Sequence, residues 1–363
     1  MSYLVSVVVP TKNRYKYLKE LIKLIDSFRL DELELVVQDN SDNNSEILEY
    51  LSTFDNPNIK YYYRTDSLTM SGNADVAISN ATGEYICYIG DDDGVCRNIV
   101  DVVRYMKERQ IAAACSDDTA WYYWNGRAKL FKSRKPFCTH ESTIQLDKLL
   151  RHGLSLWYSR MPLIYHGIVL KTKLIELQNK IGTCFPGNPP DIAGAIALSS
   201  IIDKYYEIKI PVIINGISAM AGGGVDQKGG VLPLDKVPFI NEDDILNWEK
   251  TIPPVWCGHY AWANSGMKAL RKVGLANKLE KLNLEYALAY AVAYKPHNRQ
   301  LRRLSFKYST NVVYLLFLIV FLFARRYIQK IHNNVKLFVS QSYTQKTIIE
   351  AEQFFTNHTT VKL

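Results

Sequence analysis

Cysteine is sparse in this chain, and the cysteines that are present form no metal-binding pattern. The six cysteines are scattered along 363 residues, and no two of them have the spacing of a CxxC motif. This excludes a zinc ribbon and predicts reduced thiols in a cytosolic protein. A P-loop ending in Gly-Lys-Ser or Gly-Lys-Thr is also missing. The glycines concentrated in 215–235 therefore predict a loop and not nucleoside triphosphate chemistry.

A hydrophobic run long enough to cross a bilayer is missing as well. Residues 312–324 are continuously apolar, but they number only thirteen, whereas a membrane span takes about 20. Acidic residues are absent from 295–336, where nine lysines and arginines flank this run. We expect 312–324 to lie in the cytoplasmic leaflet with the basic residues on an anionic membrane surface. A spanning helix, a buried helix and an oligomer contact stay open as alternatives.

The composition is that of a folded globular protein, with 47% hydrophobic and 22% charged residues. A net charge of +8 permits an anionic partner. The first apolar segment ends at Pro10 and has no basic residues before it, so it does not predict a secretory signal. We expect a cytoplasmic protein that is peripheral on the inner face of the cell membrane.

Strands and helices alternate through the first 90 residues. The predicted strands cover 4–9, 34–37, 59–63 and 84–89, and the predicted helices cover 17–25, 47–51 and 74–81. This order predicts an α/β fold with a Rossmann-like, mostly parallel sheet and helices on both faces. Ligands bind such sheets beyond the carboxyl ends of the strands. The polar residues Thr11, Asp39 and Asp91–Asp93 are predicted there.

The pattern becomes less regular after residue 100. It predicts a helix over 99–109, strands over 111–115 and 162–170, and an aromatic hairpin strand over 121–124 before Asn125-Gly126. A small-residue helix follows over 192–202, and further helices cover about 241–293. We therefore expect a catalytic domain over 1–240, a helical extension over 241–295 and a membrane-associating region over 296–363.

The three consecutive aspartates Asp91–Asp93 follow the fourth predicted strand, after Gly90. Like charges at the end of an apolar strand repel one another and destabilise the fold. A bound divalent cation would remove that cost, because Mg²⁺ or Mn²⁺ held by one or two carboxylates completes its shell with substrate phosphates. This favours a diphosphate-binding site over a solvated turn.

Several motifs together resemble family 2 glycosyltransferases. They are Val7-Val8-Val9-Pro10-Thr11-Lys12-Asn13-Arg14, Val36-Val37-Gln38-Asp39-Asn40-Ser41, Gly72-Asn73-Ala74, Ala81-Thr82-Gly83-Glu84-Tyr85-Ile86 and Ile89-Gly90-Asp91-Asp92-Asp93. The resemblance is good over about 3–125 and weaker to about 205. It implies an A-type glycosyltransferase fold and a nucleotide diphosphate sugar as donor.

The resemblance also implies roles for individual residues. Carried over by position, Asp93 and Asp91 bind Mn²⁺ or Mg²⁺, while Asp91 or Asp92 faces the ribose and diphosphate. Gln38 and Asn40 depart from the residues that the family more often has there. The nucleotide-sugar-binding set implied by position is Pro10, Thr11, Arg14, Asp39, Asn73, Asp91 and Asp92.

Members of this family invert the anomeric carbon, which requires a carboxylate base to take the proton of the acceptor hydroxyl. Asp191 matches the position of that base, in a loop before a helix, although the more common Glu-Asp pair is missing. An ordinary helix-capping aspartate is the alternative for Asp191. Asp203 and Asp117 are weaker candidates, and Asp117-Asp118 is either near the donor sugar or in a solvated turn. His166 is predicted to be a buried, hydrogen-bonded histidine, with a place in the acceptor pocket as the alternative. His259 is predicted to pack, with contact to the phosphates as the alternative.

These expectations combine into an inverting transfer from a donor that the resemblance implies to be UDP-linked. The acceptor would be a lipid-linked oligosaccharide or polysaccharide in bacterial surface glycan (O-antigen or capsule-like) biosynthesis. One alternative is a nucleotidyltransferase, which would release pyrophosphate. Another is a membrane-surface scaffold or nucleic-acid binder. We expect no nucleic-acid partner, because the basic residues flank an apolar block and are not interleaved with exposed aromatics.

Overall fold

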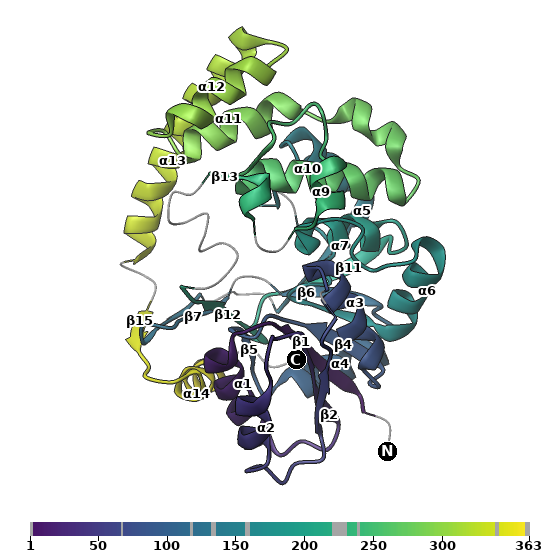
Figure 1. Cartoon of the computed structure of the whole chain (residues 1–363). Coiled ribbons are helices and arrows are strands. Elements are labelled where there is room, and N and C mark those ends of the chain that lie inside the picture. The colour runs from purple at the N-terminus through teal and green to yellow at the C-terminus, as the bar shows by residue number, and fades with distance from the viewer. Residues whose placement is uncertain are drawn as a thin grey trace.

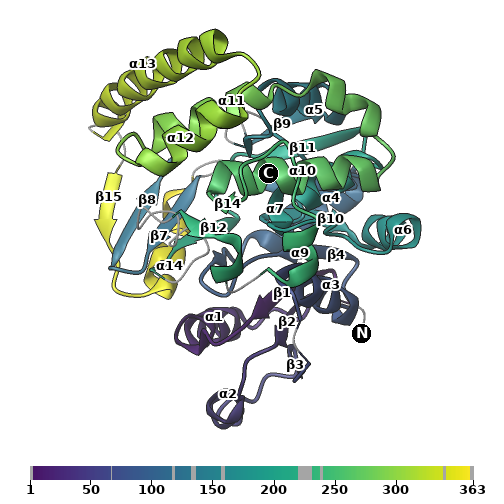
Figure 2. The same cartoon turned by 45° about the horizontal axis from the view of Figure 1, so that its top comes forward.

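The computed structural model describes residues 3–66, 68–116, 119–131, 136–156, 160–219, 231–237, 240–337 and 341–359, with the backbone alone for 329–337 and 341–342. A central sheet in the lower half of the molecule is overlaid by a helical layer (Figures 1 and 2). The sheet order is β3 (Ile59–Tyr63), β2 (Leu33–Asp39), β1 (Val5–Thr11), β4 (Tyr85–Tyr88), β10 (Gly167–Leu170), β6 (Ala113–Ser116), β11 (Lys204–Ile208) and β9 (Phe137–Glu141).

The predicted α/β class is confirmed, but the sheet is mixed and not mostly parallel. The first four strands in the order pair in parallel, as predicted. Strand β10 is antiparallel to both of its neighbours, β4 and β6. The chain enters β10 from an irregular segment and not from a crossover helix, so the rule that makes consecutive βαβ strands parallel does not apply there.

Alternate side chains of β1 and β2 pack on opposite faces of the sheet, which produces two hydrophobic cores. Val5, Val7 and Val9 join one core, and Val8 joins the other. The first core is covered by α1 (Tyr15–Phe28), α4 (Ile99–Glu108) and α14 (Ile348–His358). The second is covered by α3 (Met70–Asn80), α5 (Ser142–Arg151), α6 (Lys171–Ile181), α7 (Pro190–Ser199), α10 (Gly258–Lys272) and α11 (Leu284–Tyr294).

A second sheet brings segments that are distant in the sequence close to the end of β4. Its order is β15 (Gln341–Thr344), β8 (Arg127–Leu130), β7 (Ala120–Tyr123), β12 (Ile213–Ile217) and β5 (Gly94–Val95). β7 and β8 form the predicted aromatic hairpin, with Gly126 in the left-handed region at φ 87°. Because β5 directly follows the three aspartates and pairs with β12, this pairing holds β12 against the aspartates.

The C-terminal third of the chain leaves the sheet and then returns to it. The remaining helices are α2 (Ser45–Leu51), α9 (Glu242–Leu246), α12 (Arg299–Tyr308) and α13 (Val312–Leu337). α13 packs along α11 at the margin of the molecule (Figure 1), whereas β15 pairs with β8 and α14 packs on α1. Part of the region 296–363 therefore contributes to the core of the N-terminal domain. Among the described residues, no helix is both long enough and apolar enough to cross a membrane.

Candidate active site

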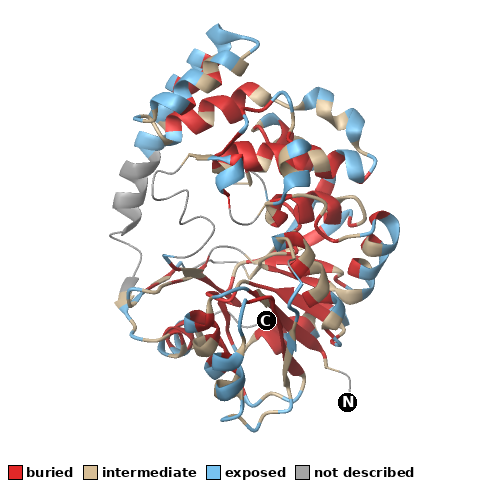
Figure 3. Ribbon diagram, viewed as in Figure 1, coloured by how far each residue is buried: buried red, intermediate tan, exposed pale blue. Residues whose placement is uncertain are grey.

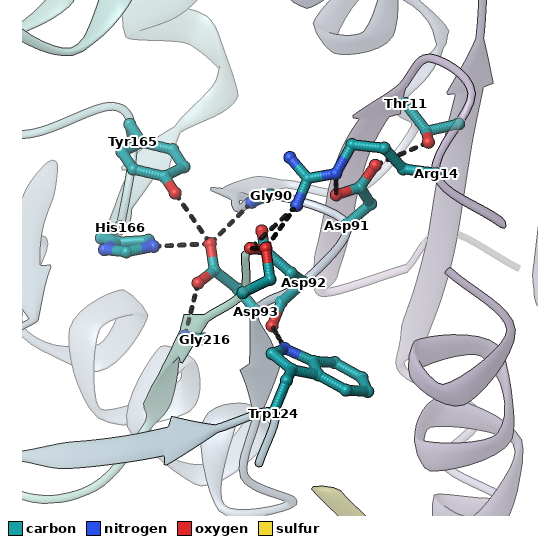
Figure 4. A network of polar contacts seen from close by, with 11 residues as sticks. Thr11, Arg14, Gly90, Asp91, Asp92, Asp93, Trp124, Tyr165, His166 and Gly216 are labelled. Carbon is teal, nitrogen blue, oxygen red and sulfur yellow. Dashed lines mark hydrogen bonds and ion pairs between the residues drawn. The ribbon is translucent and has the colours of Figure 1, made fainter. Parts of the chain in front are cut away.

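The polar residues predicted at the carboxyl ends of the strands do meet at one edge of the sheet. Thr11 is paired in register with Asp39 on the neighbouring strand β2. The Thr11 hydroxyl donates a hydrogen bond to Asp91 Oδ2 at 2.7 Å, which joins the end of β1 to the segment after β4 (Figure 4). All of Asp91, Asp92 and Asp93 are buried. The aspartates are therefore not a solvated turn.

Arg14 contacts the first two of these carboxylates. Its Nε lies 3.1 Å from Asp91 Oδ1, and its Nη2 lies 2.8 Å from Asp92 Oδ2. Ser218 donates a further hydrogen bond to Asp92 Oδ2 at 2.5 Å. Burial raises the pKa of Asp91 to about 7, against the opposing charge of Arg14, and burial also raises the pKa of Asp92. The contacts within the chain therefore do not fully stabilise the ionised forms of these two carboxylates.

Asp93 is held differently, by donors that surround both of its oxygens. Oδ2 accepts hydrogen bonds from Gly90 N at 2.8 Å and Tyr165 Oη at 2.9 Å, and it lies 2.7 Å from His166 Nε2 (Figure 4). Oδ1 accepts from Gly216 N at 2.8 Å. Burial opposes ionisation, but the charge and hydrogen bond of His166 outweigh it and hold the pKa of Asp93 below its usual value.

Four residues that contact the aspartates were not identified by the sequence motifs: Trp124, Tyr165, Gly216 and Ser218. A Cβ on Gly216 would lie 1.6 Å from Asp92 O, so only glycine allows β12 to approach the aspartates this closely. The Trp124 indole donates to Asp92 O at 2.8 Å. Gly216 was predicted to lie in a glycine-rich loop over 215–235, but Ile213–Ile217 form the strand β12, in which a glycine often marks such a close approach.

The residues expected to bind the nucleotide lie beside the aspartates. Asp39 is fully buried, and its carboxylate accepts hydrogen bonds from Tyr15 Oη at 2.6 Å and Tyr61 Oη at 2.7 Å. The Asn73 amide donates to Thr11 O at 3.3 Å, while its Oδ1 is buried with no hydrogen-bond partner among the described residues. Pro10 is half-buried next to Thr11. Asn73 Oδ1 is thus an acceptor available to a ligand.

Asp191 lies in the first turn of α7, and its carboxylate is fixed by two donors. Ile192 N donates to Oδ1 at 2.7 Å, and Trp262 Nε1 from α10 donates to Oδ2 at 3.0 Å. Burial raises the pKa of Asp191, and these hydrogen bonds and the charge of His166 partly oppose the rise. His166 therefore interacts electrostatically with both Asp191 and Asp93. It has a φ of 59°, a backbone strain that often accompanies functional sites.

The weaker candidates lie elsewhere. Asp203 is exposed, before β11. His259 is buried and packs against the rings of Trp262 and Tyr290. Asp117-Asp118 and the glycine-rich residues 220–230 lie outside the described residues.

The chemistry of this cluster fits a hard divalent cation that shares its shell with a ligand. Asp91 Oδ1 is a buried carboxylate oxygen that accepts no hydrogen bond from the described residues. Within the same residues, no three His, Cys, Asp or Glu side chains converge as a complete metal-binding set. One or two carboxylates plus phosphate oxygens are the usual way in which Mg²⁺ is held. Arg14 would have to yield part of its contact with Asp91 to such a cation.

A separate cavity of about 650 Å³ is lined in part by the loop that leads to Asp191. None of the predicted site residues lines this cavity, so it is not the pocket of the three aspartates. Its walls come from the start of α3, the loop 185–188, α9 and α10, and they include Ser71, Asn188, Asp244, Lys268 and Arg271.

The fold and the site define an α/β protein whose buried aspartates lie beyond the carboxyl ends of parallel strands, where such sheets bind their ligands. Residues 6–165 match the sequence profile described as Glycosyl transferase family 2. This part of the chain is a family 2 glycosyltransferase domain, as the motifs predicted.

Individual relatives match over shorter stretches. Glycosyltransferase GlyG of Streptococcus pneumoniae is 28% identical over 152 residues, which cover 40% of this chain and 49% of GlyG. The GalNAc(5)-diNAcBac-PP-undecaprenol beta-1,3-glucosyltransferase of Campylobacter jejuni is 33% identical over 91 residues, which cover 24% and 29%. The chain thus spans less than half of the length of these curated relatives. Among solved structures, S. aureus TarS with UDP-GlcNAc has a TM-score of 0.49 at 16% identity, over 80% of this chain and 71% of that chain.

Proposed function

We propose that the chain is an inverting glycosyltransferase that moves a sugar from a nucleotide diphosphate to an acceptor hydroxyl. The observation that carries the proposal is the buried cluster of Asp91–Asp93, in which Asp91 contacts both Thr11 and Arg14. The family of residues 6–165 supports the same reaction class.

The donor would lie across the ends of β1, β2 and β4. Pro10, Thr11, Asp39 and Asn73 would contact the base and ribose, with uridine as the base that we favour. Arg14 and Asp92 would face the diphosphate. Mn²⁺ or Mg²⁺ on Asp91 and Asp93, when bound, would neutralise the developing charge of the leaving diphosphate.

Asp191 would act as the general base. It takes the proton from the acceptor hydroxyl while that oxygen forms a bond to the anomeric carbon, and the bond from this carbon to the diphosphate oxygen breaks. The products are the inverted glycoside and the nucleoside diphosphate. The two donors that hold the Asp191 carboxylate would orient it for this transfer.

We further propose a lipid-linked oligosaccharide or polysaccharide acceptor at the inner face of the cell membrane, in surface glycan synthesis. The name of the Campylobacter relative refers to an undecaprenol-linked substrate, which supports an acceptor of this kind. The basic and apolar residues of 295–336 support a location at an anionic surface.

A thermal-shift screen of nucleotide diphosphate sugars with Mn²⁺ or Mg²⁺ tests the proposal. We expect one donor class to raise the melting temperature and turnover to release nucleoside diphosphate. Release of pyrophosphate would instead establish a nucleotidyltransferase. Salt-sensitive RNA or DNA binding without any response to sugar nucleotides would establish the non-enzymatic alternative.

A further inference from the structure

Helix α13 is apolar on the side that faces away from the protein. Leu315, Leu318, Ile319 and Leu322 are buried on one face, along α11. The opposite face is exposed, and we call it the apolar stripe: Val313, Leu316, Phe317, Val320, Phe321, Ala324, Tyr327 and Ile328. Val313 is 79% exposed and Phe317 is 64% exposed. Figure 3 shows this helix at the margin of the molecule with exposed residues along it.

Such a stripe is unusual, because a surface helix ordinarily places polar residues opposite its buried face. A helix that is apolar all round is normally covered, either by protein or by lipid. The described residues place no segment of this chain over the stripe, since its side chains remain exposed. We therefore expect an apolar partner outside the described part of the chain to cover the stripe.

The charged side chains around the stripe are basic, and the stripe itself contains none. Arg326 turns back toward α11, where it donates hydrogen bonds to Ala293 O at 2.8 Å and Tyr294 O at 3.0 Å. No acidic residue occurs anywhere from 286 to 349. A protein partner would commonly be matched by charges of both signs, whereas a wholly basic rim complements an anionic surface.

Helix α12, which precedes α13, adds a second basic group. Arg299, Arg302, Arg303 and Lys307 are exposed, and none of them pairs with a carboxylate within the described part of the chain. Their charges are therefore available to an external anion. Long basic side chains beside an apolar helix face are typical of helices that lie in a membrane interface.

We propose that α12 and α13 form a docking surface for an anionic phospholipid bilayer, with α13 parallel to the membrane and its apolar stripe between the acyl chains. The opposite face of α13 is already used by α11, so the helix enters the bilayer from one side only. This proposal rests on the proposed function in one respect: it names the surface that brings the transferase to a lipid-linked acceptor. Its test requires no transfer activity.

Vesicle flotation of the full chain tests this surface directly. The probes are vesicles of phosphatidylcholine alone and vesicles that also contain phosphatidylglycerol. We expect the protein to float with the anionic vesicles. The triple variant Phe317→Ser, Val320→Ser, Phe321→Ser should stay at the bottom of the gradient, because it removes the centre of the stripe. Leu246→Ser, which changes an 80% exposed leucine on α9, is the matched control and should float like the wild type.

The charge contribution is measured separately. Arg302→Gln together with Arg303→Gln should lower the partition coefficient on anionic vesicles by on the order of fivefold per arginine, and added salt should reduce the difference. The triple variant should retain the wild-type circular dichroism and melting temperature, since the changed residues are exposed.

Three outcomes would overturn the proposal. The wild type could fail to float with anionic vesicles, or the triple variant could float as well as the wild type. Light scattering could also show a dimer that the triple variant dissociates while vesicle binding is unchanged, and the stripe would then be a contact between two copies of this chain. Nucleotide-sugar binding can succeed or fail independently of all three.

Discussion

At the scale of single residues, Asp191 is the side chain on which the proposed chemistry depends. Asp191→Asn keeps the shape of the side chain but removes the base, and its single amide oxygen can accept only one of the two hydrogen bonds from Ile192 N and Trp262 Nε1. We expect donor affinity to be unchanged and the transfer rate to fall by about 10²–10⁴-fold, as is usual when a general base is lost. Donor titration and single-turnover kinetics measure the two effects. Asp203→Asn, on an exposed aspartate before β11, is the matched control and should change neither donor affinity nor transfer rate.

The hydrogen bond from Trp262 to Asp191 leads to a prediction about pH. A base must be ionised, so the rate falls as pH drops through the pKa of Asp191, which burial raises above the usual 3.8. The Trp262 indole stabilises the carboxylate and lowers that pKa. In Trp262→Phe the acid limb of the kcat profile should therefore move to higher pH, because the carboxylate loses a donor that stabilises its charge. If the acid limb stays in place or moves to lower pH, Asp191 is not the group that takes the proton.

Gly216 makes the close approach between β12 and the aspartates possible. In Gly216→Ala the new methyl group would overlap Asp92 O, so the strand must shift and Asp93 loses its hydrogen bond from Gly216 N. We expect a loss of at least about 2 kcal/mol in the free energy of unfolding, together with weaker donor binding. Gly182→Ala is the control, since a Cβ there has open space and carries only the strain of its φ of 83°, about 1 kcal/mol. Equal losses in both variants, with donor binding intact, would contradict this role.

At the scale of elements, α14 shows that the end of the chain is part of the N-terminal domain. Phe355 is fully buried in the core beside α1. Phe355→Ala should lower the free energy of unfolding by about 3–5 kcal/mol in chemical denaturation. Phe317→Ala, on the exposed stripe of α13, should change it by less than about 0.5 kcal/mol. A small effect at position 355 would mean that α14 is only loosely docked.

Because α14 belongs to the core, membrane binding cannot be tested by removing the end of the chain. Deletion of 296–363 would remove α14 and β15 as well as α12 and α13. Such a variant would expose part of the core, so a loss of activity or solubility in it would say nothing about lipid. Substitutions confined to the stripe avoid this difficulty.

At the scale of the whole molecule, the sequence predicted the parts of the fold that depend on local order. The first four strands, their parallel pairing and the meeting of Thr11 with Asp91 follow from alternating strands and helices. The antiparallel β10 and the second sheet could not be predicted in the same way. They join segments that are far apart in the sequence, such as β4 with β10 and β5 with β12, and no local periodicity specifies such a partner.

The site was predictable to a similar extent. The carboxylates and Thr11 stand in recognisable motifs, so their roles could be inferred before their contacts were seen. Tyr165, Gly216 and Ser218 were missed because each belongs to a segment whose place beside β4 is set by long-range pairing. His166 was expected to be a hydrogen-bonded histidine, but the sequence did not identify its partner, which is Asp93.

The central claim is that the buried aspartates hold a divalent cation against a diphosphate. Calorimetric titration with the donor found in the thermal-shift screen tests this most directly, in Mn²⁺ and again in EDTA. We predict that chelation weakens donor binding by roughly 100-fold, that Asp91→Asn does the same in Mn²⁺, and that Mn²⁺ alone binds weakly. Equal donor affinity in Mn²⁺ and EDTA, unaffected by Asp91→Asn, would contradict the account.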